Sequence, residues 1–362
     1  MTDMNDNSGS IPNTEIPESA NLNNEKPKKE RVEYIDYIKA FAIVCVILGH
    51  ANFANEALKP WIMRITMAIF FFASGVFLKG NGKMTLGEWK TVLDKKFRAL
   101  MVPFFLWAVI FTKLSLPNLI KIMYGSYRMI VSSGSSRVLW FLPVQFICLV
   151  MYNSLRLVFQ EKFKTPVKLA AMAAVFGVGF LLPQISRGYP WGFNSAFAAL
   201  GFMLMGNVAY PLMHRLRQFI MKTKVGLPVG ILTACAAFAG TQFYRLNTAP
   251  VSMATGKYGN PALFLIAAVS GIIFAVTSAM IIEKLCFPII KRGLSYIGRN
   301  TFSIYILHLP SVKLAEMLFK RVPMPSWAEL TVTCVIAISF SLIGGRVISM
   351  FAPALLGNNT TK

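Results

Sequence analysis

Three ionisable residues share one apolar stretch near the start of the chain: Asp36, Lys39 and His50. An α-helix turns 100° per residue, so Lys39 and His50, eleven residues apart, project within about 20° of each other. Asp36 falls within roughly 60° of Lys39 on the same face. A neutral imidazole is well suited to take a proton from a hydroxyl near pH 7. The spacing therefore predicts a general base at His50 and a cation about 16 Å away along the same helix.

Both residues also have a purely structural interpretation. His50 ends an apolar run and can meet water at a membrane surface. Lys39 can pair with Asp36 three residues earlier, or extend its ammonium group to the interface. Ionisable groups inside membrane spans are functional candidates because their burial is costly. The residues by themselves leave both interpretations open.

The composition indicates a polytopic membrane protein. Of the 362 residues, 55% are hydrophobic and only 14% are charged, which is too apolar for a soluble chain of this size. The net charge of +22 is explained by basic cytoplasmic loops, so we expect the lipid bilayer as a partner and no nucleic acid. No metal-ligand cluster or phosphate-binding loop is visible, and we predict no metal site.

Apolar runs near twenty residues predict an all-α transmembrane bundle of about ten spans. The predicted spans are 34–52, 60–78, 99–116, 138–159, 166–182, 191–212, 225–243, 261–285, 294–309 and 327–355. Alternate segments, beginning with the N-terminal one, carry about twice as many Lys and Arg as the others, which predicts both termini in the cytoplasm. Residues 1–30 are polar and aperiodic and are predicted to be a disordered cytoplasmic tail. The membrane domain is expected over 31–355, with a short tail at 356–362.

With this orientation, three further candidate residues are expected near the cytoplasmic face, on the same side of the membrane as Lys39. Ser74 and Gly75 lie in an aromatic run, FFFASGVFL, where small residues either allow close helix packing or leave room for a ligand. Arg98 follows two lysines at the start of the third span. It is either an interfacial anchor or a contact for a phosphate-bearing ligand.

Three further candidate residues are expected near the outer face, on the same side of the membrane as His50. Trp140 lies in VLWFLPVQ at the start of a span, where aromatic belts are common. Tyr305 and His308 are three residues apart on one helical face and could hydrogen-bond a sugar. His214 lies among basic loop residues and is interpreted as solvated.

Taken together, these motifs resemble the acyltransferase family 3 integral membrane proteins. That family has a basic residue, ten residues and then a histidine in its first span, matched here by Lys39 and His50. The likeness is strongest to the fucose 4-O-acetylase-like and polysaccharide O-acetyltransferase branch. Its other matching elements are Arg31, Asp36, Gly49, Phe71, Phe72, Ser74, Gly75, Trp140 to Pro143, and Gly298 to His308. Thr66, Met67 and Ala68 stand where that branch often has His-Met-Pro.

The resemblance implies a membrane O-acyltransferase of the cytoplasmic (inner) membrane. Its acyl donor would be acetyl-CoA or another acyl-CoA as co-substrate, without a bound cofactor. Its acceptor would be a hydroxyl of a cell-surface or lipid-linked glycan, with room for a partner protein from polysaccharide biosynthesis. His50 and Lys39 are then the catalytic candidates. The donor-binding candidates are Asp36, Ser74, Gly75 and Arg98, and the acceptor-binding candidates are Trp140, Tyr305 and His308.

A polytopic glycan or lipid transporter without acyl-transfer chemistry is the alternative function. The spans offer almost no buried carboxylates for a proton relay, which disfavours a proton-coupled transporter. A membrane sensor or scaffold is disfavoured because it leaves the polar residues within spans unexplained. Binding of labelled acetyl-CoA distinguishes these classes.

Overall fold

The structure is a computed structural model that describes residues 32–51, 58–78, 83–319, 322 and 324–357. The predicted N-terminal tail, Arg31 and residues 358–362 of the predicted C-terminal tail lie outside the described residues. The α-helices are α1 (Glu33–His50), α2 (Leu58–Val76), α3 (Leu86–Ile110), α4 (Leu116–Tyr124), α5 (Tyr127–Ser132), α6 (Phe141–Phe159), α7 (Thr165–Leu181), α8 (Phe193–Lys222), α9 (Gly226–Thr241), α10 (Pro261–Leu285), α11 (Pro288–Arg299), α12 (Thr301–Phe319) and α13 (Ser326–Phe351).

Short elements connect the long helices. The 3₁₀ turns are η1 (Arg137–Trp140), η2 (Gln160–Lys162), η3 (Pro190–Gly192), η4 (Gln242–Leu246), η5 (Met253–Thr255) and η6 (Pro353–Leu356). The strands β1 (Val251–Ser252) and β2 (Lys257–Tyr258) pair antiparallel, with Val251 opposite Tyr258.

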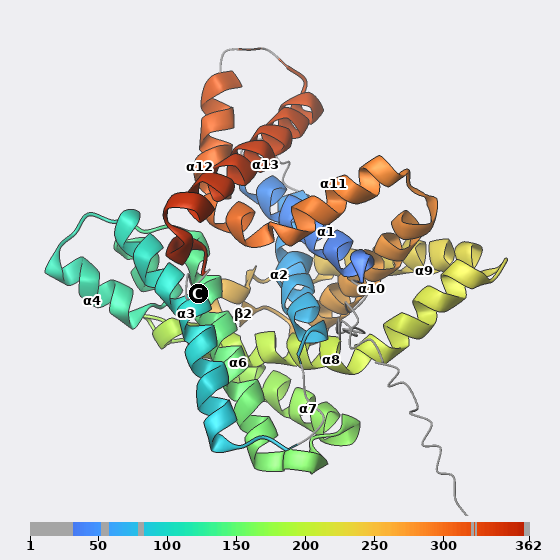
Figure 1. The fold of residues 1–362 in the computed structure, drawn as a ribbon, viewed down its shortest axis with the longest axis horizontal. Helices are drawn as coiled ribbons and strands as arrows, with labels where there is room; N and C mark the ends of the chain where they lie inside the picture. The colour runs from blue at the N-terminus through green and yellow to red at the C-terminus, as the bar shows by residue number, and fades with distance from the viewer. Residues whose placement is uncertain (1–31, 52–57, 79–82, 320–321, 323, 358–362) are drawn as a thin grey trace, which may run out of the picture. The chain divides into compact units, whose positions relative to one another are not determined.

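Helix α1 lies among five of the described helices. It packs on α2, α10, α11, α12 and, less extensively, α13, and its apolar residues are buried on nearly all sides (Figure 1). The contact with α11 is unusually close at Gly298, because a Cβ there would clash with the backbone carbonyl of Asp36. The chain is therefore organised so that α1 is enclosed along most of its length.

Helices α2 and α8 are in close contact at two glycines, one on each helix. A Cβ on Gly75 would clash with the carbonyl of Met203, and a Cβ on Gly206 would clash with the carbonyl of Phe72. Small residues let two membrane helices bring their backbones this close. Close helix packing therefore accounts for Gly75.

Large apolar side chains cover the outside of several helices. Leu232 on α9 is 70% exposed, and Phe351 on α13 is 82% exposed. Six described helices are long and apolar enough to cross a membrane, by length and composition. The helical bundle and its apolar surface fit a multi-pass membrane protein.

The six spanning helices are fewer than the ten spans that the sequence predicts. The stretches 34–52 and 60–78 correspond largely to α1 and α2, and the stretch 99–116 is helical only as far as Ile110, where α3 ends. None of these three helices meets the same criterion of length and hydropathy. Charged residues explain this for α1, which carries Glu33, Asp36 and Lys39 near its start. The segment 166–182 forms α7, which is apolar but only 17 residues long.

The predicted single helix at 294–309 is wrong. The chain breaks at Asn300, between α11 and α12. The Asn300 side chain donates to the carbonyl of Tyr296, and the Thr301 hydroxyl donates to that of Gly298. Such local side-chain bonds compete with a continuous helix. The short helices α4 and α5 and the turn η1, between α3 and α6, are also absent from the sequence prediction.

Candidate functional site

His50 lies against His308. The two rings have centroids 5.1 Å apart and are tilted by 41°. His50 is the last residue of α1, and His308 lies in the middle of α12, which packs beside it. Two of the three histidines in the chain, 258 positions apart in sequence, therefore meet at one place.

His308 is fully buried, and its hydrogen bonding fixes its tautomer. Its Nδ1 lies 2.6 Å from the backbone carbonyl of Tyr305. A carbonyl oxygen only accepts, so Nδ1 carries the proton and donates it. The other nitrogen, Nε2, is buried without a hydrogen-bond partner among the described residues. A neutral His308 therefore keeps an unused lone pair on Nε2, in a ring whose centroid lies 5.1 Å from that of His50.

Tyr305 connects α12 to the turn that carries Trp140. Its hydroxyl donates to the backbone carbonyl of Val138, and its ring packs on Phe141 at 5.2 Å between centroids. Tyr305 and Trp140 thereby line the same cavity as His50.

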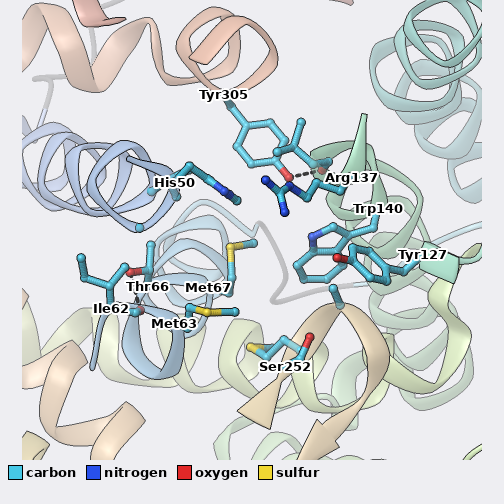
Figure 2. A pocket seen from close by; sticks show the side chains of 15 residues that line it. His50, Ile62, Met63, Thr66, Met67, Tyr127, Arg137, Trp140, Ser252 and Tyr305 are labelled. Atoms are coloured by element: carbon cyan, nitrogen blue, oxygen red, sulfur yellow. Dashed lines mark hydrogen bonds between the residues drawn. The ribbon is translucent and has the colours of Figure 1, made fainter. Parts of the chain in front are cut away.

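This cavity, called the His50 cavity, has a volume of about 140 Å³. Its walls come from α1, α2, α5, η1, α12 and the segment 252–254. Figure 2 shows His50 on one side of it, with Met63, Thr66 and Met67 of α2 below. Thr66 donates its hydroxyl to the Ile62 carbonyl at 2.7 Å, so the wall that α2 contributes is largely apolar. A small, mostly apolar chamber next to an imidazole can hold a short acyl group beside a base.

Arg137 is a residue that the sequence analysis missed. It belongs to η1 and lines the His50 cavity, where its guanidinium points between the rings of His50 and Tyr305 (Figure 2). It makes no hydrogen bond or ion pair with any described residue. Its sequence signal was its place directly before VLWFLP, where an arginine at the start of a span resembles an interfacial anchor.

The other end of α1 carries Lys39. Its ammonium lies 2.8 Å from the carboxylate of Asp36 and 5.7 Å from the ring centre of Phe77. At the opposite end, Gly49 is next to Ile62, so α1 and α2 run antiparallel. Lys39 and Ser74 are thus near one end of the α1–α2 pair, and the His50 cavity is at the other.

The side chains of Ser74 and Arg98 each interact with a residue of their own helix. Ser74 donates its hydroxyl to the Phe70 carbonyl one turn earlier. Arg98 pairs with Asp94 on its own helix at 2.9 Å, and that pair is exposed. Neither residue lines the His50 cavity, and their predicted role in donor binding stays a prediction. Among the described residues, no three His, Cys, Asp or Glu side chains gather in a way that could hold a metal ion.

Comparison with protein families gives a match over most of the chain. A model of the acyltransferase 3 type, described as an acyltransferase domain, matches residues 32–346. The chain belongs to the acyltransferase 3 family. This confirms the resemblance drawn from Lys39, His50 and the later motifs, without confirming the glycan O-acetylase branch. A search of curated proteins finds no significant match. The matched region includes every residue of the His50 cavity.

Proposed function

We propose that this membrane acyltransferase moves an acyl group, in the simplest case acetyl, from cytoplasmic acyl-CoA to a hydroxyl of a cell-surface or lipid-linked glycan. The observation that supports this most directly is the His50 imidazole, which lines a small cavity with His308 directly behind it. Neither nitrogen of His50 bonds to a described residue, so the ring is available to a substrate.

In this proposal His50 acts first as general base and then as general acid. The acceptor hydroxyl gives its proton to the imidazole as its oxygen attacks the thioester carbonyl. The carbon–sulfur bond then breaks, and the imidazolium returns the proton to the leaving CoA thiolate. In the alternative route, His50 attacks the thioester, the carbon–sulfur bond breaks and CoA leaves as the thiolate. The acyl group is then held on the imidazole and passes to the acceptor hydroxyl, whose proton goes to the released thiolate. The cavity geometry is compatible with both routes.

His308 is assigned a positioning role. It is completely buried and does not line the cavity, so contact with a bound sugar falls to Trp140 and Tyr305. Its unpartnered Nε2 can accept an N–H from His50 once that ring is protonated, which favours the imidazolium. Tyr305 donates its hydroxyl hydrogen to the Val138 carbonyl. Its oxygen keeps a lone pair that can accept a hydrogen bond from a hydroxyl group of the glycan.

The donor is proposed to approach from the cytoplasmic end of α1. Lys39 presents a cation there, beside Asp36, and anionic CoA is attracted by basic groups. The helix separates this end from His50 by about 16 Å. The proposal also includes the topology. It places ten spans in the inner membrane, with both termini in the cytoplasm.

The decisive experiment uses full-length protein in lipid nanodiscs with labelled acetyl-CoA and glycan extracted from the host membrane. We expect label in the glycan with wild type and with His214→Ala, because His214 is exposed and bonds only to Gln218 among the described residues. His50→Ala should lose transfer by about a thousandfold, the scale of a lost general base. Full transfer by His50→Ala would refute the mechanism. Failure of wild type to bind acetyl-CoA would favour the transporter.

A further inference from the structure

A second and larger cavity adjoins the His50 cavity. It has a volume of about 510 Å³ and lies between α12 and the segment from the end of α3 to η1. Arg137 lines both cavities and is their common wall residue. On the other side of the larger cavity is Lys313 of α12, five residues beyond His308 and so about 7.5 Å further along the helix.

The two cations of this larger cavity are exposed, and neither has a protein partner in the part of the chain that the structure describes. Neither Arg137 nor Lys313 has a hydrogen bond or ion pair with a described residue, and the lining contains no Asp or Glu. Two nearby basic residues differ in this respect, because Lys121 donates to the Ser132 carbonyl and Arg128 to the Ser186 carbonyl. Two unpaired cations facing one cavity favour a bound anion.

A buried hydroxyl lies in the same wall. Ser136 Oγ is buried without a hydrogen-bond partner among the described residues, although it is next to Arg137 and lines the larger cavity. A buried polar atom without a partner is costly, so a ligand that bonds to it gains affinity. Phe111 and Pro310 add apolar faces to the lining, against which a sugar ring can pack. The cavity thus combines cations, a hydroxyl and flat apolar surface.

We propose that the larger cavity binds a negatively charged substituent of the acceptor, so that the natural acceptor is an acidic glycan carrying a carboxylate or a phosphate. Arg137 and Lys313 hold the oxyanion, and Ser136 bonds to it or to a neighbouring hydroxyl. The hydroxyl to be acylated then extends past Arg137 into the His50 cavity. This inference rests on the proposed function, because it takes the His50 cavity as the place of transfer.

The test measures binding without transfer. Full-length protein in phosphatidylcholine nanodiscs is titrated at low salt with D-glucuronate, glucose 1-phosphate and D-glucose. We expect at least one acid to bind roughly tenfold or more tightly than glucose, and the tighter of the two acids identifies carboxylate or phosphate as the source of the charge. Arg137→Gln and Lys313→Gln should each weaken binding of that acid about tenfold. Lys113→Gln is the matched control, since Lys113 is exposed and lines neither cavity.

Several results would overturn the inference: equal affinity for glucose and both acids, no measurable binding by wild type, or the same loss in Lys113→Gln as in Lys313→Gln. Phosphatidylglycerol nanodiscs provide a further arm. If that lipid displaces the acids and occupies the cavity in a Lys313-dependent way, the site belongs to lipid headgroups. Acyl transfer to a neutral glycan without anion binding would refute this inference alone. Anion binding without acyl transfer to any acceptor would refute the proposed function alone.

Discussion

The two ends of α1 are built in opposite ways. At the His50 end, residues from α1, α2, α5, η1 and α12 surround a cavity, and the imidazole has no hydrogen bond to a described residue. At the Lys39 end, the ammonium pairs with Asp36 on the same helix, and the neighbouring Gly75 lies in a helix crossing. The imidazole at the His50 end is therefore accessible to a substrate, whereas Lys39 is paired on its own helix and Gly75 is packed against α8.

His308→Ala tests the His50 end most strongly. If His308 acts through His50, kcat should fall about a hundredfold, because losing the hydrogen bond that stabilises the imidazolium weakens proton transfer by His50, while the acceptor KM stays unchanged. A binding role in contact with the acceptor predicts the reverse, a raised KM with little change in kcat. Steady-state kinetics in nanodiscs separates the two, with His214→Ala as the control.

Gly75→Ala tests whether the Lys39 end is a packing site. A methyl group there meets the Met203 carbonyl, so we expect a loss of about 1–3 kcal/mol in stability from overpacking. The matched control is Gly177→Ala on α7, where a Cβ would have nothing within 4 Å. Thermal unfolding in the same detergent measures both. A donor-binding role for Gly75 would instead appear as a higher KM for acyl-CoA at unchanged stability.

Lys39→Ala and Lys39→Arg test the remaining donor role at that end. We expect Lys39→Ala to raise the KM for acyl-CoA about tenfold through loss of one cation, and Lys39→Arg to stay near wild type. The double variant Asp36→Asn, Lys39→Ala controls for the carboxylate that the single change leaves buried. Wild-type kinetics in all three would remove Lys39 from the donor site.

Tyr305→Phe should have the smallest effect. It removes the hydroxyl that bonds to the Val138 carbonyl, at a cost of about 1 kcal/mol, and leaves the ring packed on Phe141. Because that bond positions η1, we expect transfer to fall roughly fivefold, in line with 1 kcal/mol. Unchanged stability together with unchanged transfer would show that Phe141 packing alone holds η1 in place.

The sequence was sufficient for the features that depend on local periodicity. The apolar runs at 225–243 and 261–285 correspond closely to α9 and α10, and the helical course of 34–50 is confirmed in α1. Eleven residues of helix also set the common face and the separation of Lys39 and His50. The resemblance of this pair and the later motifs to the acyltransferase 3 signature predicted the family, which is confirmed. These properties need no partner from elsewhere in the chain.

Only the tertiary structure brought His308 to His50 and Arg137 into the His50 cavity. The reason is physical. Residues far apart in sequence meet through helix packing, which depends on close approaches such as Gly298 against Asp36, and no periodicity encodes such a meeting. The sequence thus determined a helix with a cation and a histidine on one face. The fold decided that the histidine lines a cavity, with a second imidazole behind it and, beside it, an arginine that no described residue pairs with.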